Sequence, residues 1–419
     1  MKTRNNLTTY IMVSLVLGIV AGYFANVGLA NPGAFAEYMS YLTTIFLRLI
    51  KMIIAPLVFA TLVVGIARMG DAKEVGRIGL KTLGWFFIAS VMSLLLGLVM
   101  VNIFRPGDAL VGHLPAVSTP SGIAATGLSL KEFITHLVPA SIIDGMAKNE
   151  ILQIVIFSLF FGTAAAAVGV KAEPLVDAVD GLAHIMLKVT GYVMNFAPVA
   201  VFAAVAGTIA KSGVGVLGTY GVFMAEFYLS IAVLWGLLIF AGFVFLGRRI
   251  FALMGEMKGP ALLAFSCASS EAAYPKTLEG LERFGVRNRI ASFVLPIGYS
   301  FNLDGSMMYC TFATVFIAQA YGIEMPLSTQ LTMMAVLMLT SKGIAGVPRA
   351  SLVVIAATLG QFNIPEAGLL LLLGIDHFLD MARSATNVIG NSVAAAVVAK
   401  WEGELVAPLD KELSDSPLP

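Results

Sequence analysis

The chain is dominated by long apolar stretches that contain few charged positions. An apolar stretch of about 18 residues or more can cross the roughly 30 Å hydrocarbon layer of a bilayer as a helix. We therefore predict an all-α membrane protein. The longest of these stretches are Tyr10–Val27, Leu42–Ala67, Leu83–Phe104, Val216–Leu246 and Leu369–Ala399.

The composition excludes a soluble globule and gives no sign of a metal site. Of 419 residues, 58% are hydrophobic and only 12% are charged, which is too little polar surface to coat a soluble protein of this size. Cys267 and Cys310 lie in apolar contexts, so no disulfide framework is indicated. The four histidines have no metal-ligand spacing. We expect neither a metal nor an organic cofactor, and no nucleic-acid partner.

Lysine and arginine collect in loops that stay in the cytoplasm, so their positions orient the predicted helices. Lys2 and Arg4 place the N-terminus inside, and the first apolar stretch is long enough to remain as an anchor. The polar stretch 105–149 has few cations, which predicts an external loop. Further helices are expected near Ile151–Val168 and Leu175–Ile209. This threading places both termini in the cytoplasm.

Two apolar stretches have the same charge signature at both ends. Phe251–Arg289 has basic residues around both ends, which favours the cytoplasm, whereas Met325–Ala367 has its only cations in the middle, which favours the outside for both ends. Small residues interrupt the first at 266–270, and Gly and Pro interrupt the second at 343–348. This pattern is typical of re-entrant helical hairpins that form an inverted repeat. Ordinary spans kinked at glycine are the alternative.

The span Ala291–Tyr321 contains Asn302-Leu303-Asp304-Gly305-Ser306 near its middle. Glycine after aspartate in mid-span favours local unwinding, which frees backbone carbonyls and brings a carboxylate to membrane depth. Such a break suits a small cation or a proton. A plain glycine kink with a buried, satisfied Asp is the alternative. With this span, we predict eight transmembrane helices plus two re-entrant helical hairpins with inverted repeats.

The last predicted span carries a stripe of polar side chains. Its members follow one another at steps of three or four residues, so they lie within one narrow arc of the helix. Charged groups inside a membrane usually face a bundle interior or an aqueous path. Arginine fits a carboxylate, a carboxylate can hold an ammonium group, and an amide can donate to a second carboxylate. The stripe therefore matches a zwitterion with an additional acid group, although a network that only fastens helices together is the alternative. It consists of Asp376, Asp380, Arg383, Asn387 and Asn391.

Together these residues resemble the glutamate transporter family, the dicarboxylate/amino acid:cation symporters, and most of all its bacterial proton/glutamate symporters. The resemblance covers nearly the whole chain. It implies a homotrimer in which a scaffold holds a mobile transport unit that moves like an elevator, with the outer hairpin as the extracellular gate. It rests on four motifs in this order: Ser269-Ser270-Glu271 with Pro275; Asn302-Leu303-Asp304-Gly305; Gly346-Val347-Pro348; and the face of Asp380, Arg383 and Asn387.

The resemblance implies a role for each matching position. Arg383 would bind the side-chain carboxylate of the substrate, Asp380 its amino group and Asn387 its α-carboxylate. Relatives that carry C4-dicarboxylates look different at the position of Asp380, so this residue favours an acidic amino acid. Arg349 would pair with Asp380 or Glu271 in the empty carrier, or face solvent. The other implied contacts are Ser270 and the backbone at Val347 from the hairpin tips, Ser306 near the side-chain carboxylate, and Gly346, Pro348 and Arg349 in the gate.

Departures from the sodium-coupled members bear on the coupling ion. Asn391 stands where those members have a sodium-binding Asp, and Phe86 and Ala89 stand where they have hydroxyl ligands, which leaves Ser90. Losing an anionic ligand and two oxygens should weaken sodium binding. Glu271 replaces a serine, and desolvation would favour its uncharged form, as a proton carrier requires. We expect coupling to H⁺, with Na⁺ as the alternative. The expected coupling residues are Glu271, Asn302, Asp304, Asn391 and Ser90.

The sequence thus predicts an elevator-type secondary active symporter for glutamate or aspartate, located in the bacterial inner membrane, and not an enzyme. The expected partners are the acidic amino acid, the lipid bilayer and two further copies of the chain. A sodium-coupled or C4-dicarboxylate symporter of the same family, a channel, and least of all an intramembrane enzyme are the alternatives. The predicted units are 1–70 (scaffold spans one and two), 71–105 (third span, transport unit), 106–215 (external loop and scaffold spans four and five), 216–405 (transport unit) and 406–419 (cytoplasmic tail).

Overall fold

The protein is described by a computed structural model that covers residues 7–67, 72–110, 138–212, 220–340, 350–373 and 375–406. Regular structure within these ranges is helical, and one isolated β-bridge pairs Val286 with Leu405. The main helices are α1 (Leu7–Gly28), α2 (Pro32–Ala67), α3 (Ala72–Phe104), α6 (Ile151–Val168), α7 (Glu173–Met194), α8 (Ala197–Ser212), α10 (Gly221–Leu246), α11 (Arg249–Cys267), α12 (Tyr274–Phe284), α13 (Asn288–Phe301), α14 (Asp304–Ala320), α15 (Leu327–Thr340), α16 (Ala350–Gln361) and α18 (Asp376–Trp401), with the shorter α5 (Ile142–Lys148) and α17 (Leu369–Leu373).

Several helices have the length and apolar composition that a membrane requires. In the described ranges, five helical stretches are long and apolar enough to cross a bilayer. The chain is therefore a multi-pass membrane protein of the all-helical class. The expected eight spans and two re-entrant hairpins stay a prediction, because length and composition alone do not define them. The five stretches are Thr9–Gly28, Lys73–Phe104, Gln153–Met194, Gly221–Leu246 and Arg249–Cys267.

Local sequence signals explain where two of the expected spans differ from the structure. α2 begins earlier than the expected Leu42, because the Asn31 side chain accepts a hydrogen bond from the Ala34 amide at 3.1 Å and Pro32 occupies the first helical position. The expected segment Leu175–Ile209 is divided into α7 and α8 by a turn at residues 195–196. Pro198, which is tolerated in the first turn of a helix, follows that turn.

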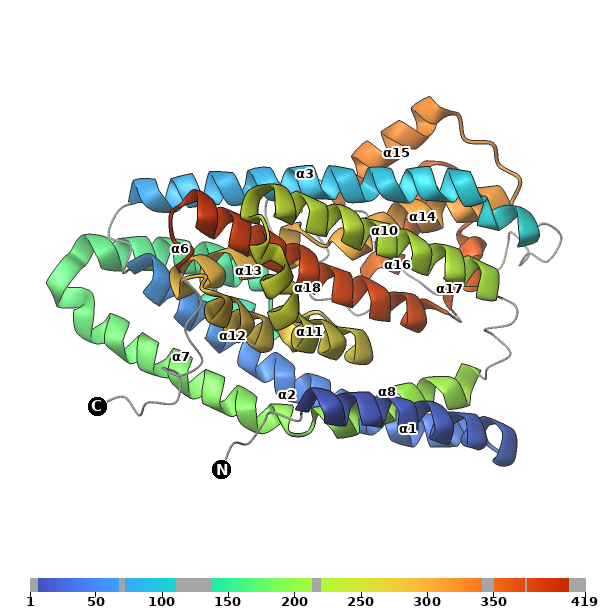
Figure 1. Cartoon of the computed structure of the whole chain (residues 1–419), viewed down its shortest axis with the longest axis horizontal. Coiled ribbons are helices and arrows are strands. Elements are labelled where there is room, and N and C mark those ends of the chain that lie inside the picture. The colour runs from blue at the N-terminus through green and yellow to red at the C-terminus, as the bar shows by residue number, and fades with distance from the viewer. Residues whose placement is uncertain are drawn as a thin grey trace.

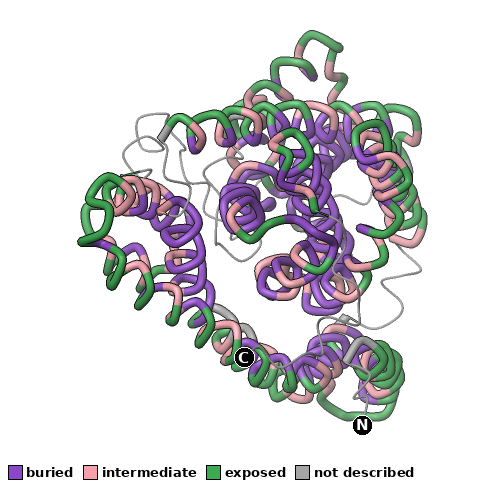
Figure 2. The backbone as a smooth tube through the Cα atoms, turned by 60° about the vertical axis from the view of Figure 1, so that its left-hand side comes forward, coloured by how far each residue is buried: buried purple, intermediate pink, exposed green. Residues whose placement is uncertain are grey.

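The helices are arranged in two layers (Figure 1). One layer contains α1, α2, α7 and α8, and the other is a bundle of α3 and α10 to α18. Glycine allows α1 to lie directly against α8, since a Cβ atom at Gly22 would come within 2.7 Å of the Ala206 carbonyl oxygen. Figure 2 shows that buried positions are concentrated in the centre of the bundle, whereas the other layer exposes residues along its length.

α18 runs through the centre of the bundle and packs against α10, α11, α13 and α14. Every residue from Met381 to Ala399 is buried. A helix that is buried all round while carrying ionisable side chains must pair those side chains within the protein or with a ligand.

The end of α18 is tied to the loop between α12 and α13. The carboxylate of Glu402 lies 2.6 Å from Arg77 and 2.7 Å from Lys81, both on α3. Glu404 pairs with Arg287 and Arg289, next to the Val286–Leu405 bridge. We call residues 402–406 the C-terminal clamp.

At the first expected hairpin, two helices are joined by an interruption, whereas the connection of the second lies outside the described residues. α11 ends at Cys267, Ala268 adopts a left-handed conformation with φ of 49°, and α12 returns along α11 after a single 3-10 turn at Glu271–Ala273. α15 and α16 flank residues 341–349, which lie outside the described residues. The predicted gate residues Gly346, Pro348 and Arg349, and the predicted backbone contact at Val347, fall in that gap. Their roles stay predictions.

Candidate functional site

The span that contains Asn302 is unwound at its middle. α13 ends at Phe301 and α14 begins at Asp304, and the two residues between them leave the helical conformation, with φ and ψ of −128° and 62° at Asn302 and of −95° and 64° at Leu303. This is the break that the Asp-Gly sequence predicted. It places Asn302 and Asp304, both fully buried, in the centre of the bundle.

A continuous set of hydrogen bonds surrounds the break. Asp304 Oδ1 accepts from the Ser93 hydroxyl at 3.2 Å, and Asp304 Oδ2 accepts from Asn302 Nδ2 at 3.1 Å. Asn302 Nδ2 also donates to Asn391 Oδ1 on α18 at 3.1 Å. Within the described ranges, Asn302 Oδ1 and Asn391 Nδ2 are buried without a hydrogen-bond partner. A buried carboxylate beside a spare carbonyl oxygen is a setting that can accept a proton or a small cation.

Phe86 and Ala89 close the side of this cluster toward α3. Both are buried. The Phe86 ring and the Asn391 side chain both lie against Gly298. Ser90 lies nearby, and its hydroxyl donates to the Phe301 carbonyl at 3.4 Å, one residue before the break. Carbon atoms therefore occupy part of the space around Asn391 that oxygen ligands of a cation would need.

Arg383 is the centre of a second polar group. Its side chain is 1% exposed, and Nη2 lies 2.9 Å from Asp380 Oδ1 and 3.3 Å from Asp376 Oδ1. The guanidinium also lies over the Tyr309 ring at 4.1 Å from the ring centroid, and the Tyr309 hydroxyl donates to Asp376 at 3.4 Å. These contacts fix the guanidinium in one orientation.

Arg383 has hydrogen-bonding capacity left over. Its Nε and Nη1 atoms are buried and have no partner among the residues that the structure describes. Leaving donors of a charged group unpaired inside a protein is costly, so a ligand is the natural partner for them. A carboxylate fits, because a guanidinium can donate to it through parallel N–H bonds.

Asp380 and Asn387 flank Arg383 on the same face of α18. The Asp380 side chain is 27% exposed, whereas Asp376 and Arg383 are each 1% exposed, so Asp380 is the carboxylate of this group that a ligand can reach. Asn387 Oδ1 accepts from the Gly305 amide at 3.0 Å, and Asn387 Nδ2 lies 3.4 Å from the Ser306 hydroxyl. The structure thus brings together Asp380, Arg383, Asn387 and Ser306.

Ser270 and Glu271 come from the tip between α11 and α12. Both are half-buried. Glu271 lines a small cavity whose other walls come from α2, α6, α12 and α13, along the seam between the two layers. Those walls are mostly apolar or aromatic. They consist of Ile54, Val58, Ile151, Tyr274, Pro296 and Tyr299.

Two contributors to these groups were not expected from the sequence. Ser93 lies three residues after Ser90 on α3, and this spacing places both hydroxyls on one face of an apolar helix. That spacing was the signal from which Ser93 could have been predicted. Tyr309 lies in an apolar run, where an aromatic residue is ordinarily part of the core, and only the structure shows it under Arg383.

Comparison with known proteins shows the family of the chain. The sequence profile of the sodium:dicarboxylate symporter family matches residues 7–401. The chain is 43% identical over 406 residues to a proton/sodium-glutamate symport protein of Geobacillus stearothermophilus, covering 94% of each chain. It is 40% identical over 410 residues to the proton/glutamate-aspartate symporter of Escherichia coli, covering 95% of this chain and 93% of the relative. A C4-dicarboxylate transport protein of Laribacter hongkongensis is also 40% identical over 410 residues, covering 96% of this chain and 91% of the relative.

Proposed function

Because the chain belongs to the sodium:dicarboxylate symporter family, we propose that it is a secondary active symporter that carries glutamate or aspartate into the cell together with protons. The family and these relatives are transporters, and the chain is not an enzyme. The observation that carries the proposal is the Arg383 guanidinium, which is buried with two unpaired donors beside a partly exposed Asp380.

An acidic amino acid satisfies each group at this site. Its side-chain carboxylate accepts from the free donors of Arg383, with the Ser306 hydroxyl nearby. Its ammonium group pairs with the Asp380 carboxylate, and its α-carboxylate accepts from Asn387 Nδ2. Ser270 and the backbone at Val347 close on the ligand from the two hairpin tips.

Asp380 favours an amino acid over a C4-dicarboxylate. The relatives include transporters of both kinds, so family membership alone leaves the substrate class open. A dicarboxylate has no ammonium group, and a reachable carboxylate at its binding site would repel it. Asp380 is such a carboxylate, with 27% of its side chain exposed.

The surroundings of Asn391 and Glu271 favour protons as the coupling ion. The amide of Asn391 is neutral, and Phe86 packs beside it, so Asn391 and Phe86 supply neither an anionic nor a hydroxyl ligand to a sodium ion at this position. Glu271 lies among apolar and aromatic walls, where a carboxyl group can cross the membrane uncharged. Asp304 with its neighbours is the second candidate for carrying a proton. Sodium coupling through Asn302, Asp304 and Ser90 is the competing assignment.

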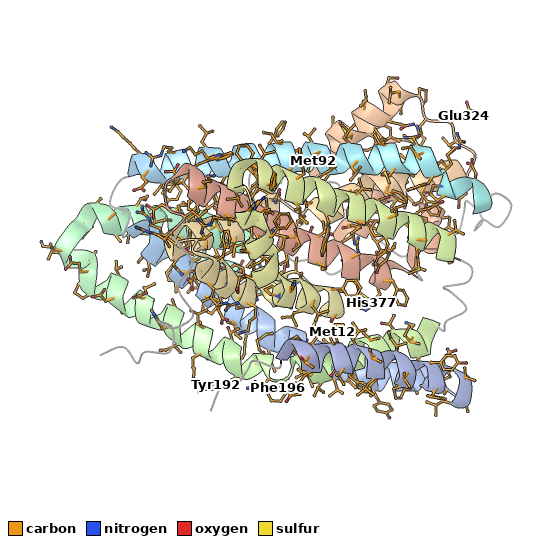
Figure 3. All side chains as sticks on the ribbon, in the orientation of Figure 1. Met12, Met92, Tyr192, Phe196, Glu324 and His377 are labelled. Atoms are coloured by element: carbon orange, nitrogen blue, oxygen red, sulfur yellow. The ribbon has the colours of Figure 1, made fainter. Side chains whose placement is uncertain are left out.

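The two layers support an elevator-type movement. In this proposal the layer of α1, α2, α7 and α8 belongs to the scaffold of a homotrimer, and the bundle around α18 is the transport unit, with α15 and α16 as its outer gate. A cavity of about 510 Å³ with both polar and apolar walls lies between the layers, and it is lined by α2, α8 and His377 at the start of α18 (Figure 3). The chain would cross a bacterial inner membrane with both termini in the cytoplasm.

Uptake by purified protein in liposomes tests the proposal. We expect accumulation of labelled glutamate or aspartate when the external pH is lower than the internal pH, without sodium on either side. A sodium gradient at equal pH should give little uptake. Uptake that strictly requires sodium would overturn proton coupling, and accumulation of succinate but not of amino acids would overturn the substrate. Passive equilibration that no gradient drives would indicate a channel.

A further inference from the structure

A large apolar groove lies on the side of α18 that faces away from the polar stripe. Its volume is about 670 Å³, within the range of ligand-binding pockets. α10, α11 and α18 form its walls, and Met12 from the start of α1 lies on the opposite side (Figure 3). The groove therefore lies on the seam between the two layers.

The aromatic residues of the groove turn their polar atoms away from it. The Tyr228 hydroxyl donates to the Phe378 carbonyl at 2.7 Å, and Trp235 Nε1 donates to the Thr386 hydroxyl at 2.8 Å. Their rings are left to line the groove together with small and aliphatic side chains. An occupant would therefore be apolar over most of its length, because these walls offer it almost no hydrogen bonds.

Lys258 on α11 is the exception in this apolar lining. It is exposed, and it has no hydrogen bond or ion pair within the described part of the chain. A lysine can lay its stem along an apolar surface and carry its ammonium group to the polar boundary of a membrane. The groove thus offers one positive charge, at Lys258 between Met254 and Ala261 of α11, whereas the rest of its lining offers hydrocarbon.

We propose that the groove binds an acyl chain of an anionic phospholipid, whose phosphate headgroup pairs with Lys258. The chain crosses a bilayer, so phospholipid surrounds this seam, and a single lysine near anionic lipid contributes an attraction that zwitterionic lipid lacks. Charge complementarity at Lys258 and the apolar walls together select this occupant over a polar metabolite.

Occupancy of the groove bears on the substrate site. Ala382, Ala385 and Ile389 line the groove, and they alternate along α18 with Arg383 and Asn387, which face the stripe. A bound acyl chain would therefore support α18 from behind, at the level of the substrate-binding residues. It would also fill the space between α1 and the bundle.

Fluorescence of Trp235 can report lipid in the groove. The sequence has three tryptophans, and Trp85 and Trp401 pack against each other away from the groove, so replacing both with Phe leaves Trp235 as the reporter. The protein is placed in two preparations of phosphatidylcholine vesicles. One contains a small fraction of phosphatidylglycerol with brominated acyl chains, and the other contains the same fraction of phosphatidylcholine with brominated acyl chains. Bromine quenches tryptophan only on contact. We expect about fivefold preferential quenching by the phosphatidylglycerol, as one lysine near anionic lipid predicts.

Matched variants separate the groove from general lipid contact. Lys258→Gln should abolish the preference, whereas Lys171→Gln, which removes an exposed lysine outside the groove, should leave it unchanged. Ala232→Phe, which fills the groove from α10, should reduce quenching by both lipids. Equal quenching by the two lipids in the unsubstituted groove, or a preference that survives Lys258→Gln, would overturn the proposal.

A measurement without tryptophan changes covers the case in which the double Phe variant does not fold. Native mass spectrometry of the unsubstituted protein, purified from vesicles with equal amounts of both lipids, should show retained phosphatidylglycerol in excess over phosphatidylcholine. The Lys258→Gln variant should lose that excess. Equal retention of both lipids by the two proteins would again contradict the proposal. None of these readouts depends on transport, so they stand apart from the test of the substrate.

Discussion

Arg383 shows how one side chain can be buried with its charge and remain available to a ligand. Asp376 and Asp380 balance its charge, and the Tyr309 ring supports its plane. These contacts use one terminal nitrogen and one face of the guanidinium, while Nε and Nη1 stay unpaired in the described structure. The side chain is thus held in one orientation, which would lower the entropy cost of the substrate binding that we propose for it.

Replacing Asp380 with Ser tests the assignment of the ammonium group. Loss of a charged partner of this kind costs a factor of about 100 or more in binding, so glutamate uptake should collapse. Binding of succinate should persist or improve, because Arg383 and Asn387 remain and a repelling carboxylate is gone. Both are measured with labelled compounds in the same liposomes. An unchanged KM for glutamate would show that Asp380 serves only to hold Arg383.

At the scale of helices, the site depends on how closely three elements approach one another. α18 meets the break between α13 and α14 at Gly390, where a methyl group would overlap the carboxylate of Asp304. Gly305, at the start of α14, lies against the backbone of Arg383. Small residues let these backbones approach. The close approach places the polar group around Asp304 beside α18 and the polar group around Arg383 beside α14.

Gly390→Ala should therefore separate α18 from the break. The added methyl group must displace Asp304 or α18, and overpacking of this kind costs about 1 to 3 kcal/mol. We expect a lower Tm in detergent and a severe loss of uptake. Gly236→Ala on α10 is the control, because a Cβ atom there meets nothing within 4 Å, and its Tm should stay the same or rise slightly. Equal Tm values for the two variants would contradict this account of the packing.

The helical class, the break at Asn302 and the buried stripe on α18 could be predicted from local patterns. Apolar length, an Asp-Gly pair and a spacing of three or four residues are all properties of short segments. The position of Tyr309 under Arg383 could not be predicted, because it depends on how α14 packs against α18. The same holds for Glu271, whose surroundings come from α2, α6, α12 and α13. The motif resemblance predicted a role for Glu271 but not which residues surround it.

At the scale of the whole molecule, the C-terminal clamp joins the ends of several bundle helices. Glu402 is bound by Arg77 and Lys81 of α3, and Glu404 by Arg287 and Arg289 at the start of α13. Arg249, at the start of α11, donates to the Val406 carbonyl at 2.8 Å. The clamp thus holds α3, α11, α13 and α18 together at one end, as the proposed transport unit requires.

The clamp should make stability depend on pH in the acid range. Burial opposes ionisation of Glu402, but hydrogen bonds from Arg77 and Lys81 outweigh it and lower its pKa below the ordinary value of 4.5. A lowered pKa stabilises the folded state above that value, and the stabilisation is lost as the pH falls through the folded-state pKa. Between about pH 5 and pH 3, the Tm of the unsubstituted protein should fall by roughly 2 °C more than that of Glu402→Gln.

Glu173→Gln is the control for this measurement, since Glu173 is exposed at the start of α7, away from the clamp. Its Tm should follow that of the unsubstituted protein at every pH. If Glu402→Gln shows the same acid dependence as the unsubstituted protein, the clamp does not contribute to stability.

The carboxylates around α18 also have an electrical consequence. Asp304, Asp376 and Asp380 each carry a formal charge of −1 and Arg383 carries +1, so these four groups sum to −2 when no proton or substrate is bound. A membrane potential that is negative inside drives such a charge outward, with about 2.3 kcal/mol per charge for every 100 mV of field crossed. If the chain works as the proposed proton symporter, the voltage speeds the return of the unloaded carrier to the outside, and loss of the potential slows uptake even at a constant pH gradient.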